Sequence, residues 1–375
     1  MKKYFPHLTA VLFLFLFACS DSNEIVEPID IVDPTPEVPV NPNADINEYI
    51  WDGMNEIYLW QANVPDLAND RFASIAEKKA FMQNTPEPEP FFNSLIYDPQ
   101  NVDFFSFFID DYEEFENQGQ GISLSNGLDF GLSRYGSGND VFGYVRLVLP
   151  GSDADGKNIK RGDIFTEVDG KQLTLLNYRT LLYSENTTYT LAISEIVNNT
   201  ITSTGISVEL TKTDYTEPSV NKIAYFEEGG KKIGYLHYTQ FTRQEKELND
   251  AFLELKNEGI TDLVLDLRYN PGGFAGVSTS LASMITGQFT GEVIKKEQWN
   301  SLYQSYFEEN NPERLEEVFR EKSYFSEDVL NTLGLSSIHV IGLSGTASAS
   351  ESLISGLQPY IEVNHIGERT YGKYT

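Results

Sequence analysis

The fold of the C-terminal part of the chain is decided by one stretch, Ile338-His339-Val340-Ile341-Gly342-Leu343-Ser344-Gly345-Thr346-Ala347-Ser348-Ala349-Ser350-Glu351. Its first six residues form a short apolar run that is typical of a buried strand, and small residues that favour a turn follow them. An apolar helix is predicted next, from Ser350 to Leu357. The stretch therefore predicts a strand, a tight turn and a helix, the unit from which layered α/β cores are built.

Ser348 lies in this predicted turn. A hydroxyl there is exposed near free backbone N–H groups and the positive end of a helix, which suits a nucleophile whose product is an oxyanion. Ser348 and Glu351 also fit a capping box, in which the serine only satisfies helix amides. Ser344, Ser350 and Ser352 are alternative nucleophiles in the same region.

A second segment, Asp266-Leu267-Arg268-Tyr269-Asn270-Pro271-Gly272-Gly273, follows a predicted buried strand at Leu263 to Leu267. The two glycines let the backbone turn sharply and direct an amide into a cleft. An oxyanion hole is built in this way, and one donor stabilises a transition state by about 3–4 kcal/mol. A plain turn at the end of a strand is the alternative interpretation.

Lys373 ends the segment Glu368-Arg369-Thr370-Tyr371-Gly372-Lys373. A lysine can accept the proton of a serine only as a neutral amine, which requires burial among apolar groups or a neighbouring cation. A solvated surface lysine is the alternative. His365 is a second candidate base for Ser348. No spacing of cysteine, histidine or carboxylate residues suggests a metal site, and no cofactor is predicted.

Composition limits the classes of function. The chain has 375 residues, 40% of them hydrophobic and 22% charged, which is typical of two or three soluble globular domains. The formal net charge is −29. Nucleic acid is therefore excluded as an expected partner, because binding it depends on cationic neutralisation of phosphates.

The N-terminus is predicted to be a signal peptide over residues 1–18. Lys2 and Lys3 precede an apolar run from Leu8 to Phe17, and Ala18 and Cys19 follow it. The segment Leu16-Phe17-Ala18-Cys19 resembles a bacterial lipobox, which implies that Cys19 is lipidated and becomes the mature N-terminus. An ordinary cleaved signal is the alternative. We expect a lipid-anchored protein of the bacterial cell envelope, on the periplasmic side or at the outer membrane surface.

Two regions of different composition follow. Residues 19–44 are acidic and proline-rich and are predicted to be an extended tether. Residues 45–118 are predicted to be a mostly helical domain, because Ile46, Ile50, Met54 and Ile57 recur at helical spacing. A second helix is expected from Ile75 to Met82. The aromatic residues Phe104, Phe105, Phe107 and Phe108 are expected to form packing surface, and stacking on a ligand is the alternative.

Residues 119–213 show short alternating runs, which predict strands at Leu128–Tyr135, Val141–Val148, Ile164–Val168 and Tyr189–Ile193, with one helix at Leu175–Tyr183. The blocks Val145 to Ala154, Lys160 to Ile164 and Val168 to Lys171 resemble those of a PDZ domain. That resemblance implies recognition of peptide tails at a sheet edge. Gly119, Gly121 and Gly127 could grip a terminal carboxylate or form an interdomain loop.

Residues 214–375 alternate strands and helices and predict a layered α/β core with right-handed crossovers. Strands are expected at Lys232–Tyr238, Leu263–Leu267 and Ile338–Leu343, with helices at Gln244–Glu258 and Val277–Ile285.

Together these features resemble the C-terminal processing peptidases, or tail-specific proteases. The resemblance extends from about residue 45 to the end of the chain. It implies a multidomain α+β protein with a helical N-terminal region, a PDZ-like β domain and a ClpP/crotonase-like peptidase core. By the same resemblance Ser348 is the nucleophile and Lys373 the base, and Ala349 with Gly272 or Gly273 forms the oxyanion hole.

The resemblance implies a serine endopeptidase that cleaves proteins or unstructured tails. The family often carries a glutamine four positions after the lysine, and that position would follow Thr375, so we expect a peptidase core that is incomplete at its C-terminus. A non-catalytic peptide-binding lipoprotein with an inactive core is the main alternative. An acyl-CoA enzyme of the same broad fold is disfavoured, because the PDZ-like block and the Gly-Lys segment have no place in it.

Overall fold

The structure is a computed structural model that describes residues 41–85, 87–184 and 186–373. The predicted signal peptide, Cys19 and most of the predicted tether lie outside these residues. From Asn43 onward the chain belongs to one compact unit. Among the helices of the described residues, none has the length and apolar character needed to cross a membrane.

The N-terminal region is helical, as predicted from its periodicity. Ser74 caps α2 by accepting from the Glu77 N–H, and Asp111 caps α4 by accepting from the Glu114 N–H. A small apolar core that includes Leu67 joins the first three helices. The helices are α1 (Ala44–Ile57), α2 (Ile75–Gln83), α3 (Pro88–Ser94) and α4 (Tyr112–Gly119), with short 3-10 turns at Gln61–Asn63 and Pro65–Leu67.

The aromatic residues before α4 differ from the expectation that they form packing surface. Phe104 is 53% exposed and Phe107 is 63% exposed, so the prediction is wrong for these two. Phe105 packs against Tyr371 with ring centroids 6.2 Å apart. The Phe104 and Phe105 ring centroids lie 4.5 Å apart, so Phe104 packs on its neighbour while it stays exposed.

Residues 119–213 form an antiparallel sheet around a core that includes Phe165, Leu191 and Leu210. The four predicted strands are confirmed, whereas the predicted helix is shorter than expected. The threonine-rich strand β7 was not predicted, because most of its residues are exposed. The strand order is β2-β3-β4-β6-β7. The elements are β2 (Leu128–Arg134), β3 (Val141–Val148), η3 (Ala154–Gly156), β4 (Ile164–Val168), β5 (Lys171–Gln172), α5 (Tyr178–Leu182), β6 (Thr188–Val197) and β7 (Thr200–Thr211).

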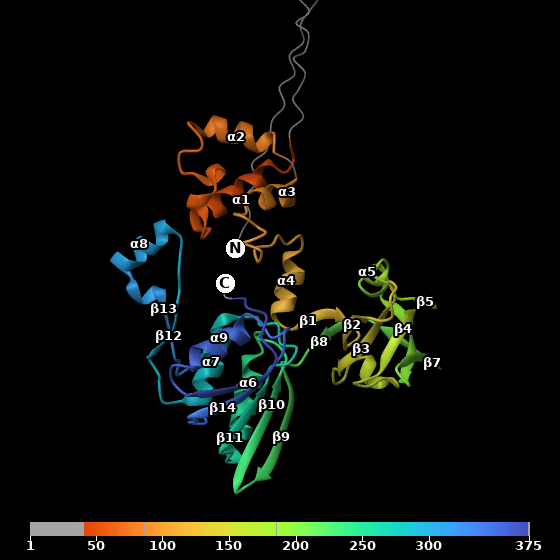
Figure 1. The fold of residues 1–375 in the computed structure, drawn as a ribbon. Coiled ribbons are helices and arrows are strands. Elements are labelled where there is room, and N and C mark those ends of the chain that lie inside the picture. The colour runs from red at the N-terminus through yellow and green to blue at the C-terminus, as the bar shows by residue number, and fades with distance from the viewer. Residues whose placement is uncertain (1–40, 86, 185, 374–375) are drawn as a thin grey trace, which may run out of the picture. The chain divides into compact units, whose positions relative to one another are not determined.

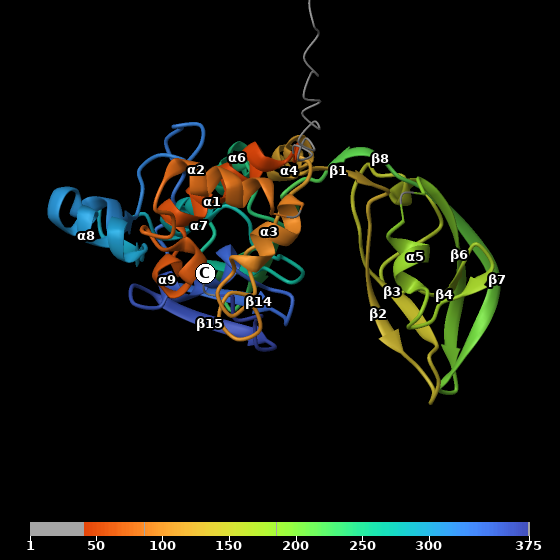
Figure 2. The same ribbon diagram turned by 90° about the horizontal axis from the view of Figure 1, so that it is seen from above.

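The third region is an α/β layer structure. Its five-stranded sheet has the order β15-β14-β11-β10-β9, in which β10, β11, β14 and β15 are parallel and β9 is antiparallel. Helix α7 packs against both α6 and α9 (Figure 1, Figure 2). The predicted strands and helices are confirmed. The elements are β9 (Val220–Glu228), β10 (Lys231–Tyr238), α6 (Glu245–Asn257), β11 (Asp262–Asp266), α7 (Ala275–Thr286), β14 (Ser337–Gly342), α9 (Ala349–Leu357) and β15 (Glu362–Gly367).

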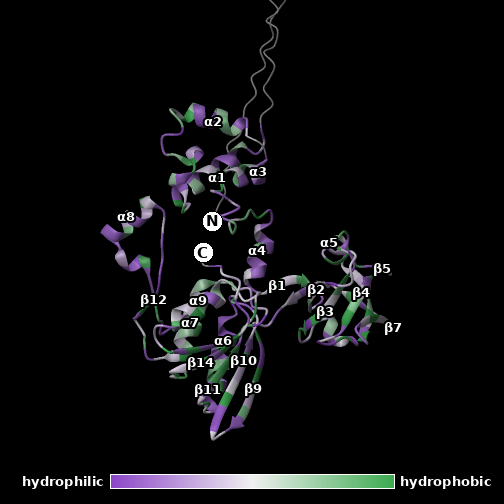
Figure 3. Cartoon of the chain, in the orientation of Figure 1, coloured by the Kyte–Doolittle hydropathy of each residue, from purple (hydrophilic) through white to green (hydrophobic). Residues whose placement is uncertain are grey.

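The hydrophobic core of this region lies between the sheet and its helices. Leu236, Leu265 and Val340 of the strands pack with Leu281 and Leu353 of the helices, and each of these side chains is at most 1% exposed. Figure 3 shows hydrophobic colours on these elements and hydrophilic colours on α4 and the far end of β9. The remaining elements are β1 (Ile122–Ser125), which pairs with β8 (Thr213–Thr216), and β12 (Val293–Lys296), α8 (Ser301–Asn310), η4 (Pro312–Leu315) and β13 (Glu316–Val318).

Candidate active site

The turn between β14 and α9 is anchored to the end of β11. The Thr346 hydroxyl donates to the Leu267 carbonyl at 2.8 Å and accepts from the Leu343 N–H at 3.0 Å. The Ala347 N–H donates to the Asn270 carbonyl at 3.2 Å. These bonds bring the predicted nucleophile turn to the predicted oxyanion segment, although about 80 residues separate them in sequence.

Ser348 has an unusual backbone conformation, with φ 55° and ψ −113°. It is the N-cap of α9 and forms a capping-box pair with Glu351, whose Oε2 accepts from the Ser348 N–H at 2.9 Å. An ordinary N-cap residue has extended backbone angles, so capping alone does not require positive φ. Strain of this kind concentrates at functional sites and is typical of a nucleophile on a strand-to-helix turn.

The competing serines are placed differently. Ser350 is fully buried and donates to the Asn270 carbonyl at 3.3 Å. Ser352 lies within α9, and Ser344 is exposed earlier in the turn. Ser348 alone of these four serines combines a half-buried position with positive φ.

Gly272 lies directly against the nucleophile turn. A Cβ at this position would be 2.7 Å from Ser348 Cβ and 2.9 Å from the Ala349 nitrogen, and its φ is 105°. Gly273 has φ 133°, and a Cβ there would be 2.1 Å from the Phe241 carbonyl oxygen. Only glycine fits this approach, because contacts under 3.0 Å leave no room for a side chain.

The backbone amides around Ser348 are not equivalent. The Gly272 N–H donates to Asn270 Oδ1 at 2.9 Å. Within the described part of the chain, the Gly273 and Ala349 N–H groups have no hydrogen-bond partner. Ala349 is the first residue of α9, where a helix leaves its amides unpaired.

Glu351 connects the nucleophile turn to the lysine segment. Its Oε2 accepts from the Ser348 N–H and from the Lys373 N–H, both at 2.9 Å, and its Oε1 accepts from the Gly372 N–H at 2.6 Å. Partial burial would raise the pKa of the Glu351 carboxyl, but hydrogen bonds from Thr370 and from these three amides outweigh that effect and lower it. Sequence reasoning treated Glu351 only as a capping partner and missed this connection.

Lys373 is half-buried, and its Nζ lies 4.9 Å from the centroid of the Phe105 ring. This contact packs the end of the Lys373 side chain against the N-terminal region. Phe105 is therefore a further residue of the site, and no sequence pattern pointed to it. His365, the alternative base, lies exposed on β15 opposite Val340.

Two parts of the chain match models of one protein family. Residues 232–375 match the description "Peptidase family S41", and residues 45–107 match "Peptidase S41 N-terminal domain". A carboxyl-terminal-processing protease of Picosynechococcus is 27% identical over 231 residues, which are 61% of this chain and 50% of that protein. A CtpA-like serine protease of Staphylococcus aureus is 25% identical over 273 residues, which are 70% of this chain and 49% of that protein. The chain thus spans about half the length of the curated relatives it matches.

The fold is that of a solved S41 protease from Bacteroides fragilis, with a TM-score of 0.63 and 22% sequence identity. The similarity covers 87% of this chain and 79% of that one. The structure thus belongs to the class of mixed α/β peptidase folds with a helical N-terminal region. The chain belongs to peptidase family S41.

Proposed function

We propose that this protein is a serine endopeptidase in which Ser348 is the nucleophile and Lys373 the base. One observation carries the proposal: the strained Ser348 lies against Gly272, and Glu351 holds the Ser348 and Lys373 backbones on one carboxylate oxygen. A capping serine would need neither the positive φ nor the lysine segment.

In the proposed reaction, Ser348 and Lys373 act in turn. Ser348 Oγ attacks the carbonyl carbon of a peptide bond, and its proton passes to the neutral amine of Lys373. Lys373 then gives that proton to the leaving amine as the C–N bond breaks. Water attacks the resulting ester, and its proton returns through Lys373 to Ser348 Oγ as the acid product leaves.

We assign the oxyanion hole to the N–H groups of Ala349 and Gly273. Both amides lack a partner among the described residues, whereas the Gly272 amide is already bonded to Asn270. Gly272 instead permits close approach to Ser348 because it has no side chain. Two donors at this site would each stabilise the oxyanion by about 3–4 kcal/mol.

We propose that residues 119–213 act as a PDZ-like domain that recognises protein tails or gates the site. Two arginines of this domain contact Tyr269, which lies within the oxyanion segment. The Nη atoms of Arg161 are 3.3 Å from the Tyr269 hydroxyl, and the guanidinium of Arg146 is 5.0 Å from the centroid of its ring. A cavity of about 280 Å³ is lined by Leu128 and Leu147 and by Tyr269.

A carboxylate grip by the glycines before β2 is not supported. The Gly121 N–H donates to the Gln118 carbonyl at 2.9 Å, and the Gly127 N–H donates to Ser125 Oγ at 3.0 Å. Gly119 belongs to the last turn of α4.

We further propose that the protein is attached to the bacterial cell envelope through a lipid on Cys19. The support is the pattern of the first 19 residues, in which two lysines, an apolar run and Ala18 precede the cysteine. Such an anchor would keep the peptidase at a membrane surface.

Labelling of the full-length protein with a fluorophosphonate probe tests the catalytic proposal. We expect the parent to be labelled and to cleave an unfolded protein. Ser348→Ala should lose both properties, and Lys373→Met should lose at least about 1,000-fold in cleavage, as removal of a catalytic triad member does. Ser344→Ala is the matched control in the same turn and should behave like the parent.

Two results would reject the catalytic assignment. One is labelling that persists in Ser348→Ala. The other is tight binding of tail peptides by a parent protein that is neither labelled nor active, which would indicate a peptide-binding protein with an inactive core.

A further inference from the structure

A cavity of about 270 Å³ lies in the segment that leads into α4 and is separate from Ser348 and Lys373. Three carboxylates and several aromatic or aliphatic side chains form its wall. The lining residues are Phe107, Phe108, Ile109, Asp110, Asp111, Glu114, Phe115 and Gln118.

The two ends of this segment contact the two halves of the proposed active site. Before the cavity, Phe105 lies beside Lys373 Nζ and the Tyr371 ring. After it, the Gly119 carbonyl accepts from the Arg243 N–H, and a Cβ at Gly119 would be 3.2 Å from the Phe274 ring. Phe274 directly follows the proposed oxyanion glycine Gly273, so the cavity belongs to a stretch that connects the lysine side of the site to its oxyanion side.

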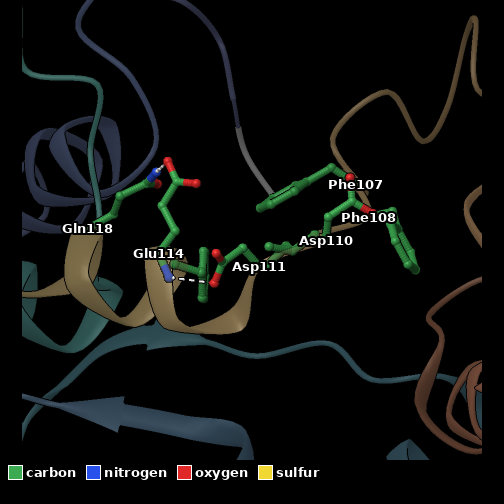
Figure 4. Close-up of a pocket in the computed structure, with 8 residues that line it drawn as sticks. Phe107, Phe108, Asp110, Asp111, Glu114 and Gln118 are labelled. Atoms are coloured by element: carbon green, nitrogen blue, oxygen red, sulfur yellow. Dashed lines mark hydrogen bonds between the residues drawn. The ribbon is translucent and has the colours of Figure 1, made fainter. Parts of the chain in front are cut away.

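The wall of the cavity combines apolar faces with three carboxylates. Phe107 is 63% exposed and Phe115 is 42% exposed, with ring centroids 6.4 Å apart. Among the described residues, no lysine or arginine lines the cavity, and none forms a salt bridge with Asp110, Asp111 or Glu114. Figure 4 shows the Phe107 ring directed toward the side chains of Asp111 and Glu114, while the Phe108 ring points away.

We propose that this cavity is a subsite for a lysine or arginine side chain of the polypeptide substrate. The inference rests on the proposed peptidase function and adds a specificity to it. The apolar stem of such a side chain would cover the two phenylalanine rings, and its cationic end would meet the carboxylates. A metal ion fits less well, because no group of three acidic or histidine side chains in the described residues converges as metal ligands.

Charge decides between a basic side chain and the other side chains of a substrate. An acidic side chain would be repelled by three carboxylates. An aliphatic one would cover the rings but remove water from charges that it cannot pair. A basic side chain is attracted by the carboxylates and covers the rings, so both parts of the wall favour it as the occupant.

Peptide binding to full-length Ser348→Ala protein, measured by fluorescence anisotropy, tests the subsite without cleavage. The probes are one unstructured peptide with lysine at alternate positions and its counterpart with norleucine, which keeps the four-carbon stem and lacks the ammonium group. Asp110→Asn, Asp111→Asn and Glu114→Gln are combined in the test variant. The asparagine that replaces Asp111 would still cap α4, and the glutamine that replaces Glu114 would still accept the bond from Gln118 that is 3.2 Å long in the parent.

The matched control combines Glu209→Gln, Glu227→Gln and Glu228→Gln, which are exposed on β7 and β9 and remove the same charge. In the Ser348→Ala protein without further substitutions, we expect the lysine peptide to bind about tenfold more tightly than the norleucine peptide. A partly desolvated cation over aromatic faces beside carboxylates gains binding free energy of this order. The test variant should lose this preference, and the control should keep it.

Equal binding of the two peptides, or an equal loss of preference in the test and control variants, would overturn the subsite. The second result would mean that only the overall negative charge attracts the lysine peptide. Probe labelling is scored separately on the protein that retains Ser348. A preference for the lysine peptide without labelling contradicts the peptidase function, and labelling without that preference contradicts the subsite.

Discussion

At the scale of single residues, the Glu351 carboxylate connects the two segments of the proposed dyad. It accepts from the amides of Ser348, Gly372 and Lys373, which lie at the two ends of the proposed dyad. A carboxylate that accepts several backbone N–H bonds is stabilised in its charged form. In the proposed mechanism Glu351 is therefore a positioning residue, because it holds the backbone of Ser348 and that of Lys373 on one carboxylate.

Glu351→Gln should reduce both stability and cleavage. The glutamine has one oxygen where the carboxylate has two, so an amide of Ser348, Gly372 or Lys373 loses its acceptor. We expect about 1–3 kcal/mol less unfolding free energy, measured with denaturant, and a fall in kcat larger than any change in KM. Glu368→Gln, at an exposed neighbouring position, is the control and should leave both unchanged.

The stability difference between the parent and Glu351→Gln should depend on pH. Because folding lowers the pKa of Glu351 from its ordinary value of 4.5, its charged form adds stability that is fully present above that value. This stability is lost as the pH falls through the folded-state pKa. Denaturant unfolding at several acidic pH values should show the difference shrinking, and a difference that stays constant or grows would contradict the proposed hydrogen-bond set.

At the scale of elements, the site is a strand–turn–helix unit packed on a glycine turn. Thr346 joins the β14–α9 turn to the end of β11, and Gly272 leaves room for Ser348 because it has no side chain. Ser348 follows β14, whereas Gly272 and Gly273 follow β11, so neither segment forms the site alone. The carboxyl ends of parallel strands lie at one sheet edge, which is where ligands bind in such folds.

Gly272→Ala should impair the site through its new Cβ. That atom would be 2.7 Å from Ser348 Cβ and 2.8 Å from the Ala347 carbonyl oxygen, at a φ of 105°. We expect a loss of about 1–3 kcal/mol in stability from backbone strain and a much larger loss of probe labelling at Ser348. Labelling rates and denaturant unfolding measure the two effects.

Gly345→Ala is the matched control, because its new Cβ would meet no atom within 4 Å and its φ is not positive. Parental labelling in Gly272→Ala, or equal damage in Gly345→Ala, would show that close packing of Gly272 on Ser348 is unimportant.

The burial of an element decided whether the sequence could predict it. Strands β10, β11 and β14 and helices α6, α7 and α9 have strong apolar periods, and each was predicted close to its observed bounds. Strand β15 was not predicted, since it lies at the sheet edge and most of its residues are exposed or half-buried. Periodicity reports burial, so an edge strand gives a weak signal.

At the scale of the whole molecule, the N-terminal region contributes directly to the proposed site. Phe105 contacts Lys373 across more than 260 positions of the chain, and Tyr303 of α8 bonds Glu56 of α1 at 2.5 Å. The family match on residues 45–107 includes Phe105. The helical region therefore takes part in the proposed site.

Phe105→Ala should lower kcat with little change in KM. The substitution removes the ring that lies 4.9 Å from Lys373 Nζ and 6.2 Å from the Tyr371 ring, so the lysine side chain loses its support. A contact of this kind is worth about 0.5–1 kcal/mol at a partly exposed site, and we expect a loss of about twofold to fivefold in kcat. Tyr49→Ala, at an 80% exposed aromatic of α1, is the control. Parental kcat in Phe105→Ala would exclude this role of the N-terminal region.

The amino-acid sequence by itself determined the order of the buried strands and helices and the identity of the turn residues. Apolar period, glycine and small-residue turns are local properties, because backbone hydrogen bonding and side-chain burial repeat every two or 3.6 residues. These properties made Ser348, Gly272 and Gly273 candidates, and the resemblance to a peptidase family assigned the roles of Ser348 and Lys373.

Only the tertiary structure decided which of these residues meet. It placed Gly272 on Ser348, tied Lys373 to Ser348 through Glu351, and brought Phe105 to the lysine. It also showed that Asn270 occupies the Gly272 amide. Such contacts join positions far apart in the chain, and they depend on how packed elements exclude water and satisfy one another's polar groups, which no local pattern encodes.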